Sequence, residues 1–281
     1  MDLLTLLIYI QMALYATTAF IALLYACVIL CIRRFREINN IFIVNICLSI
    51  TMSCVYFTSY FPVALSMDST SHLCVFYSYL FNLASITIPY SFVAFTVHRF
   101  CIVNYHRARL FKKIEWMIIC IGSFWIIQLI LSLPFITDYD EYCTMKSWMG
   151  FYTFTIAVII PILINIILDI RIFLIVRRST RRVQAQNVST VRCSVRKSSI
   201  RITRRDISLL KHMIVIFLLF VIGWTPVFLL NLIDIIIPGH IYQIIYCMYL
   251  CILSTLGIIA YLFIFNYELR RYLCDRIRCC F

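Results

Sequence analysis

Seven long runs of apolar residues, separated by short polar segments, dominate the sequence. The runs cover residues 3–32, 41–65, 74–97, 114–136, 148–176, 207–237 and 241–265. Each run is at least as long as the roughly 20 residues that a helix needs to cross the hydrocarbon core of a bilayer. Because lipid offers the backbone no hydrogen-bond partner, continuous apolar runs of this length indicate helices. The pattern therefore predicts an all-α membrane protein: one domain over residues 1–281, built as a seven-transmembrane helix bundle.

The composition excludes a soluble domain. Hydrophobic residues make up 63% of the chain and charged residues 13%, whereas soluble domains carry about 25% charged residues. The mean hydropathy of +0.96 agrees with this reading.

Basic residues occur almost only in alternate connecting segments, and this predicts the orientation. With residue 1 outside, the cytoplasmic segments are 33–40, 98–113, 177–206 and the tail from 266. These segments and their borders then hold 24 of the 25 Lys and Arg residues, and Lys146 is the exception, whereas six acidic residues fall on each side. The positive-inside rule thus predicts a multi-pass protein of the plasma membrane with an extracellular N-terminus and a cytoplasmic C-terminus. Membrane orientation also explains the net charge of +13 without a nucleic-acid partner.

Most of the 14 cysteines lie inside the apolar runs, where a thiol behaves as a small apolar group. Cys74 and Cys143 fall at or near the predicted outer loops, with Cys247 a less favoured third. An oxidising compartment favours a disulfide between the first two. It would join the loop after the fourth span to the start of the third, and two free thiols are the alternative.

The tail, residues 266–281, is expected to form a short amphipathic helix on the inner membrane surface. Apolar residues recur there at helical spacing beside arginines that anionic lipid would attract. Three cysteines next to this apolar face are candidate palmitoylation sites: Cys274, Cys279 and Cys280.

Several short motifs occur in order at characteristic spacing. Cys74 precedes Arg99 by twenty-five positions, and His98-Arg99-Phe100 closes the third span. The remaining motif residues are Trp125, Pro134, Pro161, Phe220, Trp224, Pro226 and Tyr261. Together they resemble the rhodopsin-like family of G-protein-coupled receptors, and the resemblance covers nearly the whole chain.

The resemblance implies a receptor that passes an extracellular signal to a heterotrimeric G protein. It places G-protein coupling at His98, Arg99 and Asp206, with an Arg99–Asp206 ion pair in the resting state. It implies an activation switch formed by Pro161, Phe220, Trp224, Pro226 and Tyr261. It implies a mostly uncharged ligand pocket lined by Phe81, Asn82, Ser85, Thr153, Phe228, Asn231 and Gln243. Such a lining is typical of small-molecule sites, and the expected ligand is a peptide or a small uncharged molecule. Phe81 stands where amine receptors carry an aspartate, and Cys251 where opsins carry the retinal lysine.

The chain also departs from the family pattern. Ile50 replaces the sodium-binding aspartate and Ile88 the third-span serine. Gly257 and Ile258 replace the seventh-span Asn-Pro, and Asp169 stands where the fifth span usually has tyrosine. We therefore expect no sodium dependence.

Two alternative classes are a multi-pass transporter and a non-signalling seven-helix membrane protein. A transporter usually shows internal repeats and polar groups at mid-membrane, and we find no repeat. An enzyme is not expected, because the five histidines are scattered and no H-E-x-x-H or G-x-S-x-G motif occurs. No cofactor or metal is expected.

Overall fold

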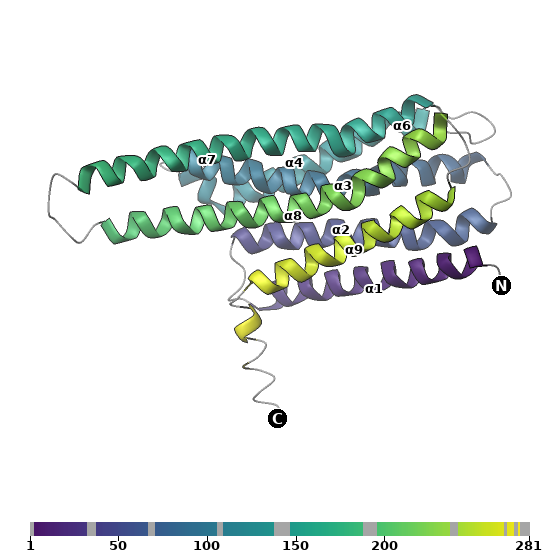
Figure 1. Ribbon diagram of the computed structural model, residues 1–281, viewed down its shortest axis with the longest axis horizontal. Helices are drawn as coiled ribbons and strands as arrows, with labels where there is room; N and C mark the ends of the chain where they lie inside the picture. The colour runs from purple at the N-terminus through teal and green to yellow at the C-terminus, as the bar shows by residue number, and fades with distance from the viewer. Residues whose placement is uncertain are drawn as a thin grey trace.

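The computed structural model describes residues 3–32, 38–66, 71–105, 109–137, 147–187, 196–236, 241–266, 269–272 and 275, and all of its regular elements in these ranges are helices (Figure 1). The long helices are α1 (Leu3–Cys31), α2 (Ile38–Ser66), α3 (Ser71–Asn104), α4 (Ile114–Ser132), α7 (Ile160–Asn187), α8 (Arg196–Ile236) and α9 (Ile241–Phe265). The shorter ones are η2 (Arg109–Lys112), α5 (Pro134–Thr137), α6 (Ser147–Phe154) and η3 (Thr155–Ile159).

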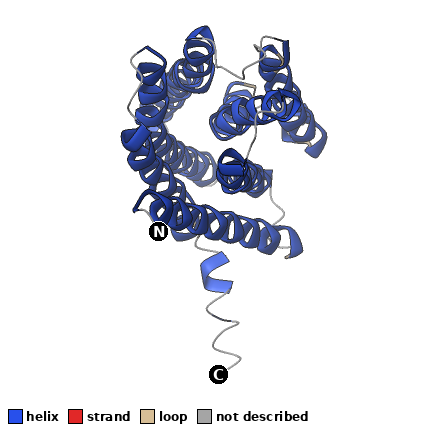
Figure 2. Cartoon of the chain, turned by 90° about the vertical axis from the view of Figure 1, so that its right-hand side faces the viewer, coloured by secondary structure: helices blue, strands red, loops and turns tan. Residues whose placement is uncertain are grey.

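Seven helical segments within the described residues are long and apolar enough to cross a membrane, which confirms the predicted fold class. The fourth segment combines α4 and α5, and the fifth combines α6, η3 and α7. Viewed from one end, the helices lie side by side as a bundle (Figure 2).

The third helix is the centre of the bundle. In the most apolar stretch of this helix, 83% of the residues are buried. In the corresponding stretch of the fourth span the share is 22%. Its buried residues include small side chains and hydroxyls as well as aromatic rings, among them Ala84, Thr87, Ser91 and Phe92. Helices that pack closely in lipid use such small and polar residues at their contacts.

Prolines explain the two interruptions of the spans. Helix α4 ends at Ser132 and α5 starts at Pro134, a position in the first helical turn where the missing N–H of proline costs little. In the fifth span, η3 is a π-helical segment that ends just before Pro161. Proline cannot donate to the carbonyl four residues earlier, and π-helical geometry occurs mostly as single turns of this kind inside α-helices.

Helices α7 and α8 continue beyond the apolar runs that predicted them, α7 to Asn187 and α8 back to Arg196. The apolar pattern ends where the helices leave lipid, but arginine and lysine are good helix formers in water. Both helices therefore continue beyond the stretch of apolar residues.

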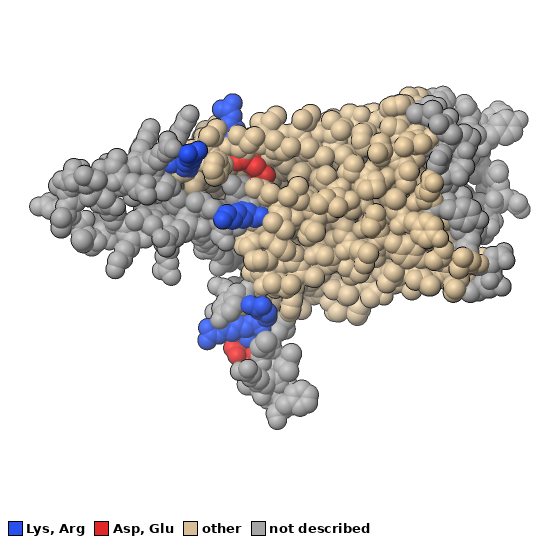
Figure 3. Space-filling view, viewed as in Figure 1, with Lys and Arg blue, Asp and Glu red and all other residues tan. Residues whose placement is uncertain are grey.

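Exposed lysines and arginines gather at one end of the described surface, the end towards which α7 and α8 extend (Figures 1 and 3). The basic side chains described as exposed are Lys113, Arg171, Arg177, Lys211, Arg270 and Arg271. We call this the basic end of the bundle.

Candidate functional site

A buried arginine lies near the basic end of the central helix. Arg99 is 8% exposed, and its guanidinium carbon lies 5.6 Å from the centre of the Phe95 ring. A guanidinium above an aromatic face is attracted by the ring's quadrupole. The preceding residue, His98, is fully buried and packs on Phe42 of α2, with ring centres 4.6 Å apart. Neither ring nitrogen of His98 has a hydrogen-bond partner.

A carboxylate lies on the buried stripe of α7. Asp169 follows Pro161 and Asn165 at intervals of four, and Asn165 is 2% exposed. The Oδ1 atom of Asp169 is buried without a hydrogen-bond partner. Unpaired ionisable groups inside a membrane are costly, and such residues usually have a functional role.

A column of aromatic rings runs through the bundle and has Trp224 at its middle. The ring of Trp224 lies 5.8 Å from Phe220, 6.1 Å from Phe228 and 5.7 Å from Phe57 of α2. Phe220 in turn contacts Phe92 of α3 at 6.0 Å. The structure thus brings together three residues expected from the motifs and connects them to α2 and α3. The indole Nε1 of Trp224 is buried and has no hydrogen-bond partner.

Helix α8 packs tightly on α9 close to this tryptophan. Gly223 has so little space that an added Cβ would lie 2.2 Å from the Cβ of Ser254. Ser254 Oγ donates to the carbonyl of Leu219 at 2.6 Å, and Cys251 Sγ donates to that of Gly223 at 3.3 Å. Only a residue without a side chain fits at position 223, which stands beside the expected switch.

Further along the same pair of helices, towards the basic end, Tyr261 contacts α8. Its hydroxyl lies 2.9 Å from His212 Nδ1, and its ring centre lies 4.3 Å from that of Phe265. The His212 ring packs against Phe265 at a tilt of 47°, with ring centres 4.0 Å apart. Sequence reasoning singled out Tyr261 but not His212.

The expected ligand-pocket residues fall into two groups. Asn82 and Thr153 form a buried polar network in which Thr153 Oγ1 donates to Asn82 Oδ1 at 3.2 Å and Asn82 Nδ2 donates to Ser132 Oγ at 3.1 Å. This network joins α3, α4 and α6. Ser85 Oγ donates to the Phe81 carbonyl of its own helix at 2.7 Å.

The second group is aromatic or lies near the predicted outer ends of α8 and α9. Phe228 belongs to the aromatic column, and Phe81 packs on Tyr56 and Phe57 with ring centres 6.2 and 6.4 Å away. Asn231 of α8 is half-buried and Gln243 of α9 is exposed. The aromatic rings Tyr56, Tyr60 and Tyr77 extend this wall between α2 and α3, and the motifs did not signal them.

Hydroxyl groups join α2 to α3 where the family has its sodium site. Ser49 Oγ and Ser91 Oγ lie 2.6 Å apart, and Ser53 Oγ donates to the Ala84 carbonyl at 2.7 Å. Ile50 and Ile88 are both buried beside them. The described part of this region is therefore uncharged.

Two further features were not anticipated. Trp125 Nε1 donates to Asn45 Oδ1 at 3.0 Å, which ties α4 to α2. Pro89 lies inside α3 and removes a backbone hydrogen bond from the most buried helix. The sequence could have indicated the Pro89 feature, because a proline stands there within an apolar run.

Some expected site residues lie outside the part of the chain whose side chains are described. Cys143, Cys274, Cys279 and Cys280 fall outside the described residues, and so does most of the tail. The backbones of Cys74 and Asp206 belong to α3 and α8, but their side chains are not described. The Cys74–Cys143 disulfide and the Arg99–Asp206 pair therefore stay predictions. Among the described residues, no group of three or more His, Cys, Asp or Glu side chains is placed to hold a metal ion.

The family comparison agrees with this geometry. Residues 22–266 match the model of the 7 transmembrane receptor (rhodopsin family). Seven spans, a buried arginine near one end of the central helix and a Trp–Pro pair in the sixth span define a receptor of this class. The chain belongs to the rhodopsin family of seven-transmembrane receptors, and it is a multi-pass membrane protein. No curated protein matches it significantly.

Membership confirms the resemblance drawn from the motifs and favours a receptor over a transporter or an enzyme. Receptors of this family act in signal transduction, with an extracellular ligand and a G protein as their general classes of partner.

Proposed function

We propose that this chain sits in the plasma membrane with its N-terminus outside and passes an extracellular signal to a heterotrimeric G protein at its basic end. The observation that carries the proposal is the buried Arg99 near the basic end of the central helix. An arginine is costly at this depth unless it has a partner. Asp206, which belongs to α8, is the partner that we propose for the resting state.

Activation is proposed to occur by rotation of α8 about Pro226. Proline removes a backbone hydrogen bond inside this helix and allows it to bend. The stretch from Asp206 to Pro226 is roughly 30 Å long at about 1.5 Å per residue. A small rotation at Pro226 therefore moves the inner end by several ångströms, separates Asp206 from Arg99 and opens a surface for the G protein.

Trp224 couples this movement to the outer half. Its ring contacts Phe228 on the outer side and Phe220 on the inner side of the same helix. A ligand that displaces Phe228 would change the packing of Trp224 directly, and one that displaces Phe81 would change it through Phe57. The proposed ligand is a peptide or a small uncharged molecule, which is supported by the aromatic and amide side chains of the expected pocket and by the absence of charge among their described members.

The test is nucleotide exchange on a purified G protein, with the chain reconstituted in lipid nanodiscs. Basal binding of a non-hydrolysable GTP analogue should exceed that of empty nanodiscs. Arg99→Ala should remove the excess, because Arg99 is also proposed to take part in coupling to the G protein once the ion pair is broken. Arg171→Ala, which changes an exposed arginine at the same end, is the matched control and should leave exchange unchanged. Exchange that never exceeds the empty-nanodisc level across a panel of G-protein subtypes, with or without a ligand library, would contradict the proposal.

A further inference from the structure

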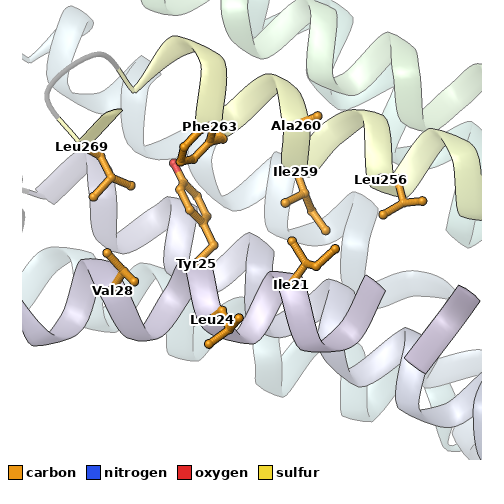
Figure 4. A pocket seen from close by; sticks show the side chains of 9 residues that line it. All are labelled: Ile21, Leu24, Tyr25, Val28, Leu256, Ile259, Ala260, Phe263 and Leu269. Carbon is orange, nitrogen blue, oxygen red and sulfur yellow. The ribbon is translucent and has the colours of Figure 1, made fainter. Parts of the chain in front are cut away.

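An apolar groove of about 450 Å³ lies between the first and last spans (Figure 4). Its walls are Ile21, Leu24, Tyr25 and Val28 of α1, Leu256, Ile259, Ala260 and Phe263 of α9, and Leu269. Each helical wall spans eight residues, a rise of roughly 10 Å along the helix. In Figure 4 the side chains of Ile21, Tyr25 and Val28 point from α1 towards α9, and Leu269 lies at the end next to Val28.

The groove faces lipid, not the bundle interior. Ile21 and Leu24 are 39% and 49% exposed, and Phe263 is 37% exposed. All of them belong to spans, so their surroundings are acyl chains. The groove differs from the ordinary lipid-facing surface because it is concave and can enclose one apolar molecule.

The polar atoms at the groove are already engaged. Tyr25 Oη donates to the Leu262 carbonyl at 3.2 Å and accepts from Asn266 Nδ2 at 3.4 Å. A ligand with a polar group inside the groove would leave that group unpaired in lipid, which is costly. The occupant must therefore be a hydrocarbon chain whose polar end lies elsewhere.

Positive charge stands where that polar end would emerge. Leu269 is fully buried and closes the groove at the basic end of the bundle. The next two residues, Arg270 and Arg271, are exposed. Asp275 lies 4.0 Å from Arg271 and offsets part of this charge, but both side chains are about two-thirds exposed or more. Exposed ion pairs of this kind are weak.

We propose that the groove is a lipid-binding site for an anionic phospholipid of the leaflet at the basic end. One acyl chain lies between α1 and α9, and the phosphate binds Arg270 and Arg271. The site depends only on the membrane placement of α1 and α9. Evidence against G-protein coupling would therefore not contradict the lipid site, and evidence against the lipid site would not contradict G-protein coupling.

Photo-crosslinking tests the proposal. The full chain is reconstituted with phosphatidylserine or phosphatidylcholine that carries a diazirine in one acyl chain, and the labelled peptides are identified by mass spectrometry. We expect label from phosphatidylserine on residues 21–28 and 256–263. We expect it to exceed label from phosphatidylcholine about five-fold or more, because each basic residue near the surface favours an anionic lipid by roughly that factor.

Two sets of variants separate the chain site from the headgroup site. Ala260→Trp fills the groove and should reduce labelling several-fold, whereas Ile118→Trp, on the exposed face of α4, should not. Arg270→Gln combined with Arg271→Gln should bring the ratio of the two lipids close to one while the groove is still labelled. Lys113→Gln combined with Arg177→Gln, which changes two other exposed basic residues, should preserve the ratio. Thermal unfolding of each variant confirms that it is folded.

Several results would overturn the proposal. Label spread evenly over α4, α7 and α9 would mean that the groove has no preference for lipid chains. Competition by a sterol but not by phosphatidylserine would identify a sterol site. Crosslinks between two copies through α1 that protect the groove from label would identify an interface between receptors.

Discussion

At the scale of single residues, Gly223 is a position where the structure leaves no room for a side chain. An added Cβ would meet Ser254 Cβ at 2.2 Å and Ser254 Oγ at 2.5 Å, and the backbone oxygen of Leu250 at 3.1 Å. The first two atoms belong to a short side chain on a packed helix and cannot move aside. The pair therefore fixes the closest approach of α8 to α9, beside the hinge at Pro226.

Gly223→Ala should destabilise the receptor by about 1–3 kcal/mol, the usual cost of overpacking a well-packed core. Thermal unfolding in detergent measures the loss. Gly257→Ala is the matched control: it lies on the partner helix, and nothing stands within 4 Å of its added Cβ. The control should be neutral or slightly more stable, because alanine favours a helix over glycine. The double variant Gly223→Ala, Ser254→Gly should recover most of the loss, and failure to recover would show that the close approach is not the cause.

The buried isoleucines at positions 50 and 88 lead to a prediction about sodium. Ile50 is fully buried, and the hydroxyls near it bond to one another or to backbone carbonyls. A bound cation needs a charged or oxygen-rich site to replace its water. The unfolding temperature should therefore be the same in sodium chloride and in choline chloride at equal ionic strength. Ile50→Asp is the positive control for this assay. Its unfolding temperature should be lower than that of the original chain, and sodium chloride but not choline chloride should restore part of the difference.

At the scale of elements, the relation between sequence and structure depends on the kind of contact. The number and approximate position of the spans could be predicted because each is encoded by a continuous apolar run. The end of α7 at Asn187 and the start of α8 at Arg196 could not be located, since the stretches that lead to them are rich in arginine and lie beyond the apolar pattern. The motif residues Phe220, Trp224 and Phe228 share one helix face, so their stacking follows from spacing alone.

Contacts between helices were harder to anticipate. The Trp125–Asn45 bond, the His212–Tyr261 contact and the Gly223–Ser254 approach each join residues far apart in the chain. Their partners are set by how the helices rotate and cross, and no period in the sequence carries that information. Asn82 and Thr153 were expected to face a ligand, but their amide and hydroxyl bond to each other, so a ligand at this depth must compete with that network.

The contact between α8 and α9 near the basic end should restrain activation. The Tyr261 hydroxyl and His212 Nδ1 lie 2.9 Å apart, and outward rotation of α8 would separate them. Tyr261→Phe removes the hydroxyl and keeps the ring packed on Phe265. Basal nucleotide exchange should rise several-fold, because one neutral hydrogen bond contributes about 1 kcal/mol to the resting state.

Tyr249→Phe is the control for that prediction. It also removes a tyrosine hydroxyl from α9, one that donates to the Leu7 carbonyl at 2.8 Å and ties α9 to α1, away from α8. Basal exchange should stay at its original level in this variant. Equal increases in both variants would mean that general loosening, not release of α8, raises the activity.

At the scale of the whole molecule, the charge distribution predicts where a protease can cut. The described surface carries its exposed basic residues at one end (Figure 3), and the sequence assigns 24 of 25 Lys and Arg to that side. Trypsin cleaves after Lys and Arg. In sealed vesicles with the outer face exposed, trypsin should therefore cleave the chain only after Lys146. The Lys146→Gln variant should then resist trypsin.

Vesicles with the inner face exposed should give the opposite result. The segment between α7 and α8 contains ten arginines and lysines from Arg177 to Arg205, and trypsin should separate the chain into two membrane-bound halves there. Lys146→Gln should not change this cleavage. Cleavage between residues 177 and 205 in vesicles that expose the outer face would show that the chain has the opposite orientation. That orientation would place the basic end, Arg99 and the proposed lipid headgroup site on the outer side, where a G protein cannot reach.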